Sequence, residues 1–193
     1  AFPDRHIPDA DLAFLPPPAN LQAGLADAAY DGRPAPAASR EDHLARYHPT
    51  DPIYPAPSAT TKQALLAQPP SRRRELILAS LEELATPGHR PDPSRAGQAA
   101  YLIHSDLNLR DRICTDVFND RERTEALLQL YRGADPTLRY GLAGAAAVTQ
   151  YVTNGISLAP GQISEDNPAD TMAGLINQAA SNGIPPDELR AVL

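Results

Sequence analysis

The chain has 193 residues, a formal net charge of −7 and a hydrophobic share of 42%, with 5% aromatics and no tryptophan. This length holds one domain, or one domain with an appendage, and the small apolar residues predict a thin core of Leu, Ile and Ala. The negative charge argues against a general nucleic-acid binder, which needs a basic surface to displace counterions.

Cysteine content and hydropathy exclude further classes. Cys114 is the only cysteine, which excludes an internal disulfide framework and a cysteine-based zinc finger. No apolar run approaches the ~20 residues that cross a bilayer, so we expect no membrane span. The chain begins at Ala1 without a methionine, which suggests a processed or shortened product whose targeting signals are missing.

The basic residues are almost all arginine. Of the 17, sixteen are arginine and Lys62 alone is a lysine. This bias is typical of a GC-rich genome and suggests a bacterial source. Selection against lysine modification is the alternative, because arginine stays charged and is not acylated.

Residues 1–70 are predicted to form a proline-rich arm with short helices, because thirteen of the 21 prolines lie there. Apolar spacing predicts a helix over Asn20–Ala29, and Ser39 is placed to cap another over Arg40–His48. The four prolines between 49 and 57 favour an extended, polyproline-like run. The arm is either disordered or laid over a partner or over its own core.

Residues 71–193 are predicted to form an irregular all-α bundle, because no segment shows sustained strand alternation. Two Asx-Pro starts lie 32 residues apart, but the sequences between them do not repeat, which argues against a solenoid. Start and stop signals predict these helices in chain order: Ser71 to Thr86, Pro93 to His104, Leu107 to Val117, Asp120 to Arg132 after an Asn119–Glu122 capping box, Asp135-Pro136 to Asn154-Gly155, Asn167-Pro168 to Asn182-Gly183, and Pro186 to Leu193.

The most distinctive stretch of this bundle is Gly141 to Ala147, which also contains Gly144. A glycine within a helix costs about 1 kcal/mol relative to alanine, so close packing should compensate for two of them. Either a neighbouring helix of the same domain packs there, or the face is a docking groove for a partner helix. No lysine stands at the spacing of a phosphate-binding loop.

Ile53 and Tyr54 form the sharpest interaction candidate in the arm. The run from Asp51 to Pro55 resembles the EPIYA tyrosine-phosphorylation motifs of injected bacterial effectors, with Asp51 in place of glutamate and Pro55 in place of alanine. The resemblance implies a tyrosine that a host kinase or an aromatic-lined groove could reach. The alternative is an apolar Tyr54 that pins the arm onto the core.

Two groups of residues invite a metal or catalytic interpretation. His43 and His48 are five residues apart, about 140° around a helix, which does not suit a metal pair, so we expect no metal and no cofactor. Cys114, His104 and Asp106 are weak catalytic candidates, because a thiol nucleophile needs a base within hydrogen-bond reach. A buried, inert Cys114 is the alternative.

The leading functional hypothesis is a protein–protein interaction module, adaptor-like or effector-like, with the arm and the 141–147 face as contact surfaces. A secreted bacterial effector that acts on a host protein is one form of it, and a cytoplasmic adaptor is the other. Two alternatives remain: an enzyme of unrecognised family that uses Cys114 or the His104–Asp106 pair, and a subunit of a large assembly whose arm threads over its neighbours. The oligomeric state is left open.

Overall fold

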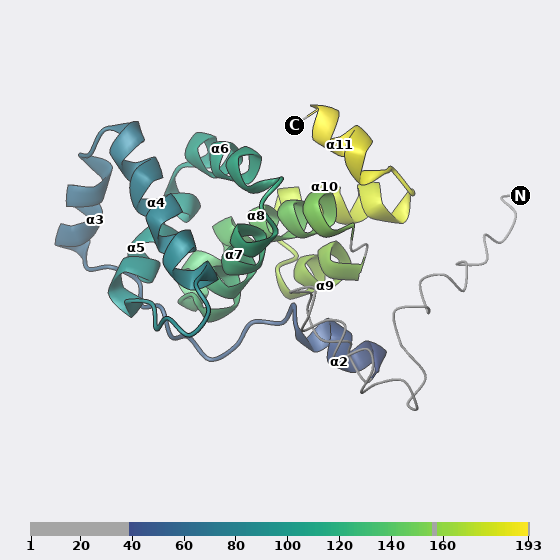
Figure 1. Ribbon diagram of the computed structural model, residues 1–193, viewed down its shortest axis with the longest axis horizontal. Coiled ribbons are helices and arrows are strands. Elements are labelled where there is room, and N and C mark those ends of the chain that lie inside the picture. Colours follow the sequence, from purple (N-terminus) through teal and green to yellow (C-terminus); the bar gives the residue numbers. More distant parts are fainter. Residues whose placement is uncertain (1–38, 156–157, 193) are drawn as a thin grey trace, which may run out of the picture. The chain divides into compact units, whose positions relative to one another are not determined.

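The computed structural model describes residues 39–155 and 158–192, and within them the chain forms ten helices and no strand (Figure 1). The predicted all-α bundle is therefore confirmed. Contacts divide the chain into Ala1–Arg46 and Tyr47–Leu193. The helix predicted over Asn20–Ala29 lies outside the described residues.

In the first unit, the described residues hold α2 (Arg40–Ala45). The Ser39 hydroxyl accepts a hydrogen bond of 3.0 Å from the backbone N–H of Asp42, so the predicted cap is confirmed. The helix ends at Ala45, three residues before the predicted end at His48.

The second unit is built around one long buried helix, α8. Its helices are α3 (Ala59–Leu66), α4 (Pro70–Ala85), α5 (Pro93–Ser105), α6 (Leu107–Val117), α7 (Arg121–Gly133), α8 (Pro136–Asn154), α9 (Leu158–Asp166), α10 (Thr171–Ser181) and α11 (Pro186–Val192). Among the described elements, α5, α6, α7, α9, α10 and α11 all pack on α8. None of the helices in the described part of the chain combines the length and apolar character needed to cross a membrane.

The ends of α8 follow the sequence signals. The Asp135 carboxylate accepts from the backbone N–H of Thr137 at 2.9 Å, and Pro136 occupies the first helical position. Gly155 ends the helix with φ at 65°, a left-handed conformation that favours glycine. Both predictions are confirmed, as is the end of α10 at Asn182-Gly183.

Three predicted caps are wrong, and each has a local reason. Pro69 precedes α4, so Ser71 lies inside the first turn and caps nothing. Asp120, not Asn119, accepts the N–H of Arg123 at the start of α7. Asp170 caps α10, because the Asn167 amide instead donates to the Ile163 carbonyl and to the Tyr131 hydroxyl.

Residues 47–58, which we call the strap, lie outside any helix and belong to the second unit. Its backbone forms a parallel bridge between Tyr54 and Ala134, with the N–H groups of Ile53 and Tyr54 donating to the Gly133 carbonyl at 2.9 Å. The compact unit thus starts at Tyr47, upstream of the boundary at residue 71 that proline density predicts. Proline stiffens an extended segment but does not prevent it from docking on its own core.

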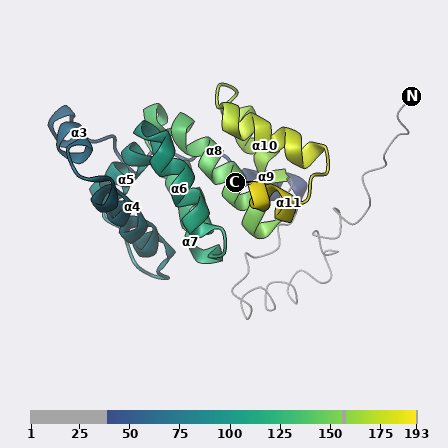
Figure 2. The ribbon, with the colours of Figure 1, turned by 90° about the horizontal axis from the view of Figure 1, so that it is seen from above.

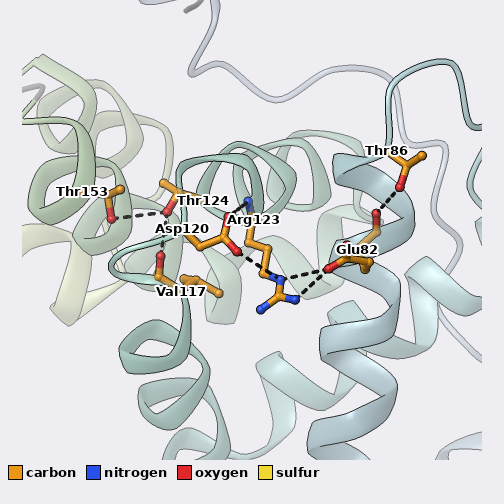
Figure 3. Close-up of polar contacts among 7 residues, drawn as sticks. All are labelled: Glu82, Thr86, Val117, Asp120, Arg123, Thr124 and Thr153. Carbon is orange, nitrogen blue, oxygen red and sulfur yellow. Dashed lines mark hydrogen bonds and ion pairs between the residues drawn. The ribbon is translucent and has the colours of Figure 1, made fainter. Parts of the chain in front are cut away.

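Polar contacts join α4, α7 and α8 around the turn that follows α6 (Figure 3). The Arg123 guanidinium donates to the Glu82 carboxylate at 2.7 and 3.1 Å. The buried Thr124 hydroxyl bonds the Val117 carbonyl at 3.3 Å and lies 3.3 Å from the Thr153 hydroxyl. The Arg123–Glu82 pair joins α7 to α4, and the Thr124 contacts fix the C-terminal end of α6 against α7 and α8.

Candidate docking groove

The glycines of α8 are points of close helix contact. All seven residues from 141 to 147 are buried within the chain. A β-carbon on Gly141 would lie 2.6 Å from the His104 Cα of α5, and one on Gly144 would lie 2.7 Å from the Met172 Cβ of α10. Tight packing against neighbouring helices therefore compensates for the low helix propensity of both glycines.

Gly141 also lies in the wall of a hollow of about 580 Å³, which we call the groove. Figures 1 and 2 place α8 between α6 and α10. The residues that line the groove come from all three of these helices. It is lined by His104 of α5, by Leu107, Arg110, Asp111, Cys114 and Thr115 of α6, by Phe118, by Tyr140 and Gly141 of α8, by Asp170 and by Thr171, Met172 and Leu175 of α10, and by Val192 of α11.

Large apolar side chains surround this groove and remain exposed. Leu107 and Leu175 are each 59% exposed, Tyr140 is 50% exposed and Val192 is 79% exposed. They come from four different helices and converge on one hollow. Single exposed apolar residues are ordinary, but a contiguous exposed patch marks an interaction surface.

Cys114 lines the groove as a protonated thiol. Its side chain is 2% exposed, and burial raises its pKa to about 12, with the opposed charges of Arg110 and Asp111 as smaller influences. The thiolate is the nucleophilic form, so Cys114 is unsuited to covalent catalysis near neutral pH.

We therefore expect Cys114 to be alkylated slowly in the folded protein. Iodoacetamide at pH 8 should modify the native thiol at least ~10-fold more slowly than the thiol of the urea-unfolded chain, because only the thiolate reacts. Mass spectrometry of quenched samples measures both rates. Equal rates would mean that the Cys114 thiol is accessible and ionised in the folded protein, and would support the enzyme hypothesis.

His104 and Asp106, the other catalytic candidates, have different surroundings. The His104 ring packs on Gly141 and lines the groove, and its Nδ1 atom is buried with no hydrogen-bond partner among the described residues. Asp106 caps α6 by accepting the N–H of Leu109 at 3.0 Å, and it pairs with the Arg73 guanidinium at 2.7 Å. Asp106 is thus engaged in structural contacts, and it is not among the groove residues.

Tyr54 and Ile53 lie apart from the groove, in the strap. Tyr54 is 4% exposed and burial raises its pKa, whereas Ile53 is 58% exposed. Both line a smaller hollow of about 180 Å³ with residues of α7. A kinase could reach the Tyr54 hydroxyl only if the strap left α7.

The two histidines considered for a metal have other surroundings. His48 pairs through Nδ1 with the Asp166 carboxylate at 3.0 Å. Burial, with the charge of Arg46, lowers the pKa of His43. In residues 39–155 and 158–192, no three His, Cys, Asp or Glu side chains come together in a way that could hold a metal ion.

Sequence reasoning found His104, Cys114 and Gly141 but missed the apolar rim of the groove. The available signal was apolar residues off the buried face of a helix, such as Leu175, whose neighbours Ala173 and Ile176 are buried. That signal does not say which helices converge. Compared with known protein families, curated proteins and solved structures, the chain matches none.

Proposed function

We propose that this chain is a protein-interaction module whose groove holds an amphipathic helix of another protein. The supporting observation is the convergence of Leu107, Tyr140, Leu175 and Val192 on one hollow. A partner helix would place apolar side chains at i, i+3, i+4 and i+7 into such a groove.

The chemistry of the groove favours binding over catalysis. The thiol of Cys114 is buried and protonated, and the Asp106 carboxylate caps α6 and pairs with Arg73. Binding by burial of apolar surface requires no activated group, only a preformed shape and exposed apolar side chains. The secreted-effector form of the hypothesis stays a prediction.

A charge placed on the groove rim should weaken binding. We expect Leu175→Asp to weaken peptide binding at least ~10-fold, because the carboxylate would be desolvated under the partner helix. The probe is a panel of labelled helical peptides of about 18 residues that carry Leu, Phe or Tyr at i, i+3, i+4 and i+7. Fluorescence anisotropy with the full chain measures Kd.

The matched control is Leu66→Asp. Leu66 is also an exposed leucine, at 46%, but it lies on α3 and does not line the groove. Leu66→Asp should bind the panel as the wild type does. If no peptide binds the wild type, or if Leu175→Asp binds as well as Leu66→Asp, the groove is not a docking site.

A further inference from the structure

We propose that the groove selects a basic partner helix, with the Asp111 carboxylate pairing with a Lys or Arg that flanks the partner's apolar face. This inference rests on the proposed docking function and names the chemistry of the partner. It follows from the charges at the groove rather than from its apolar surface.

Arg110 and Asp111 are adjacent on α6, carry opposite charges and both line the groove, but their side chains differ in exposure. The Arg110 side chain is 13% exposed, whereas the Asp111 side chain is 58% exposed. An incoming side chain therefore meets the carboxylate before the guanidinium. Exposure thus decides the sign of the charge that a partner contacts.

Arg110 engages one of the two oxygens of the Asp111 carboxylate. Arg110 donates a hydrogen bond from Nε to Oδ1 at 2.9 Å, and its Nη2 lies 2.8 Å from the same oxygen. Among the described residues, none donates a hydrogen bond to Oδ2. A carboxylate accepts at both oxygens, so Oδ2 can take a hydrogen bond from a partner's ammonium or guanidinium group.

The remaining charges favour the same kind of partner. Asp170 also lines the groove, and with Arg110 and Asp111 it leaves the formal charge of the lining at −1. The whole chain carries −7, which attracts a basic helix and repels an acidic one or a second copy. A basic helix is therefore favoured over a homodimer on this face.

The test compares two peptides on charge-reversed proteins. Both peptides carry the apolar face that binds best in the panel above, and they differ only in having three Lys or three Glu beside it. Asp111→Lys is the test variant and Glu75→Lys is its control. Asp111 and Glu75 both have side chains that are 58% exposed and paired with an arginine, but Glu75 lies on α4, away from the groove.

We expect the wild type and Glu75→Lys to bind the Lys peptide about 5–10-fold more tightly than the Glu peptide at roughly 0.05 M salt, and less selectively at roughly 0.3 M. Asp111→Lys should lose or invert this preference. If the wild type binds both peptides equally, or if Asp111→Lys keeps its preference for lysine, the inference is overturned while docking stands. If neither peptide binds, or if Leu175→Asp leaves binding unchanged, the docking function itself fails.

Discussion

Asp170→Ala should lower the free energy of unfolding by about 3 kcal/mol. Asp170 is 4% exposed and caps α10 by accepting the N–H of Ala173 at 2.9 Å. Its second oxygen accepts the N–H of Gly144, in the middle of α8, at 3.1 Å. Loss of a cap costs about 1 kcal/mol, and loss of the second hydrogen bond, in which the charged carboxylate ties α10 to α8, costs about 1.5–3 kcal/mol more.

Asp92→Ala is the matched control for this prediction. Asp92 also caps a helix, accepting the N–H of Ser94 at 2.8 Å, but it is exposed and bonds no second helix. Its loss should cost only about 1 kcal/mol. Urea denaturation measures both variants, and Asp170→Asn, which keeps one acceptor oxygen, should fall between them. Equal losses for Asp170→Ala and Asp92→Ala would show that the bond to Gly144 contributes nothing.

Gly97→Ala should destabilise the fold by about 2 kcal/mol. Gly97 is buried in α5, and a β-carbon there would overlap the carbonyl oxygen of Pro55 in the strap. The strap backbone is held on α7 by Tyr54, and Arg139 donates to the Thr50 carbonyl at 2.5 Å, so Pro55 cannot yield freely. Overpacking of this kind costs about 1–3 kcal/mol or more, and alanine recovers up to about 1 kcal/mol in helix propensity.

Gly174→Ala is the control, because a β-carbon on Gly174 in α10 meets nothing within 4 Å. That variant should gain up to about 1 kcal/mol from helix propensity alone. Urea titrations of both variants beside the wild type give the comparison. A Gly97→Ala protein as stable as the wild type would mean that the strap shifts easily or is not docked in solution.

The helices of the bundle could be predicted because their signals are local. An Asp-Pro start and an Asn-Gly stop act within one turn, and they bound α8 as expected. Where two caps compete within a few residues, local rules fail. Asn167 and Asp170 both suit the start of α10, and the choice depends on the Tyr131 hydroxyl, which binds Asn167 from α7. The helix α9 went unpredicted because Pro160 and Gly161 are poor helix formers.

Long-range placement could not be read from the sequence. Proline density predicts an extended segment near Tyr54, and residues 49–57 are indeed outside any helix. It does not reveal that the Pro55 carbonyl lies against Gly97, or that Gly133 accepts two strap N–H groups. The groove was missed for the same reason, since its rim unites residues as distant as Leu107 and Val192. Each residue alone resembles an ordinary exposed apolar side chain.

The strap also sets an order of events during synthesis on the ribosome. It emerges before the helices that hold it, since the Thr50 hydroxyl bonds the carbonyl of Arg132, 82 residues later. At roughly 5–20 residues per second, the nascent strap waits about 4–16 s for α7 to appear. During that interval Tyr54 has no α7 to pack against. The nascent chain is thus the state in which enzymes that act on tyrosine have freest access to this side chain, before the finished fold closes over it.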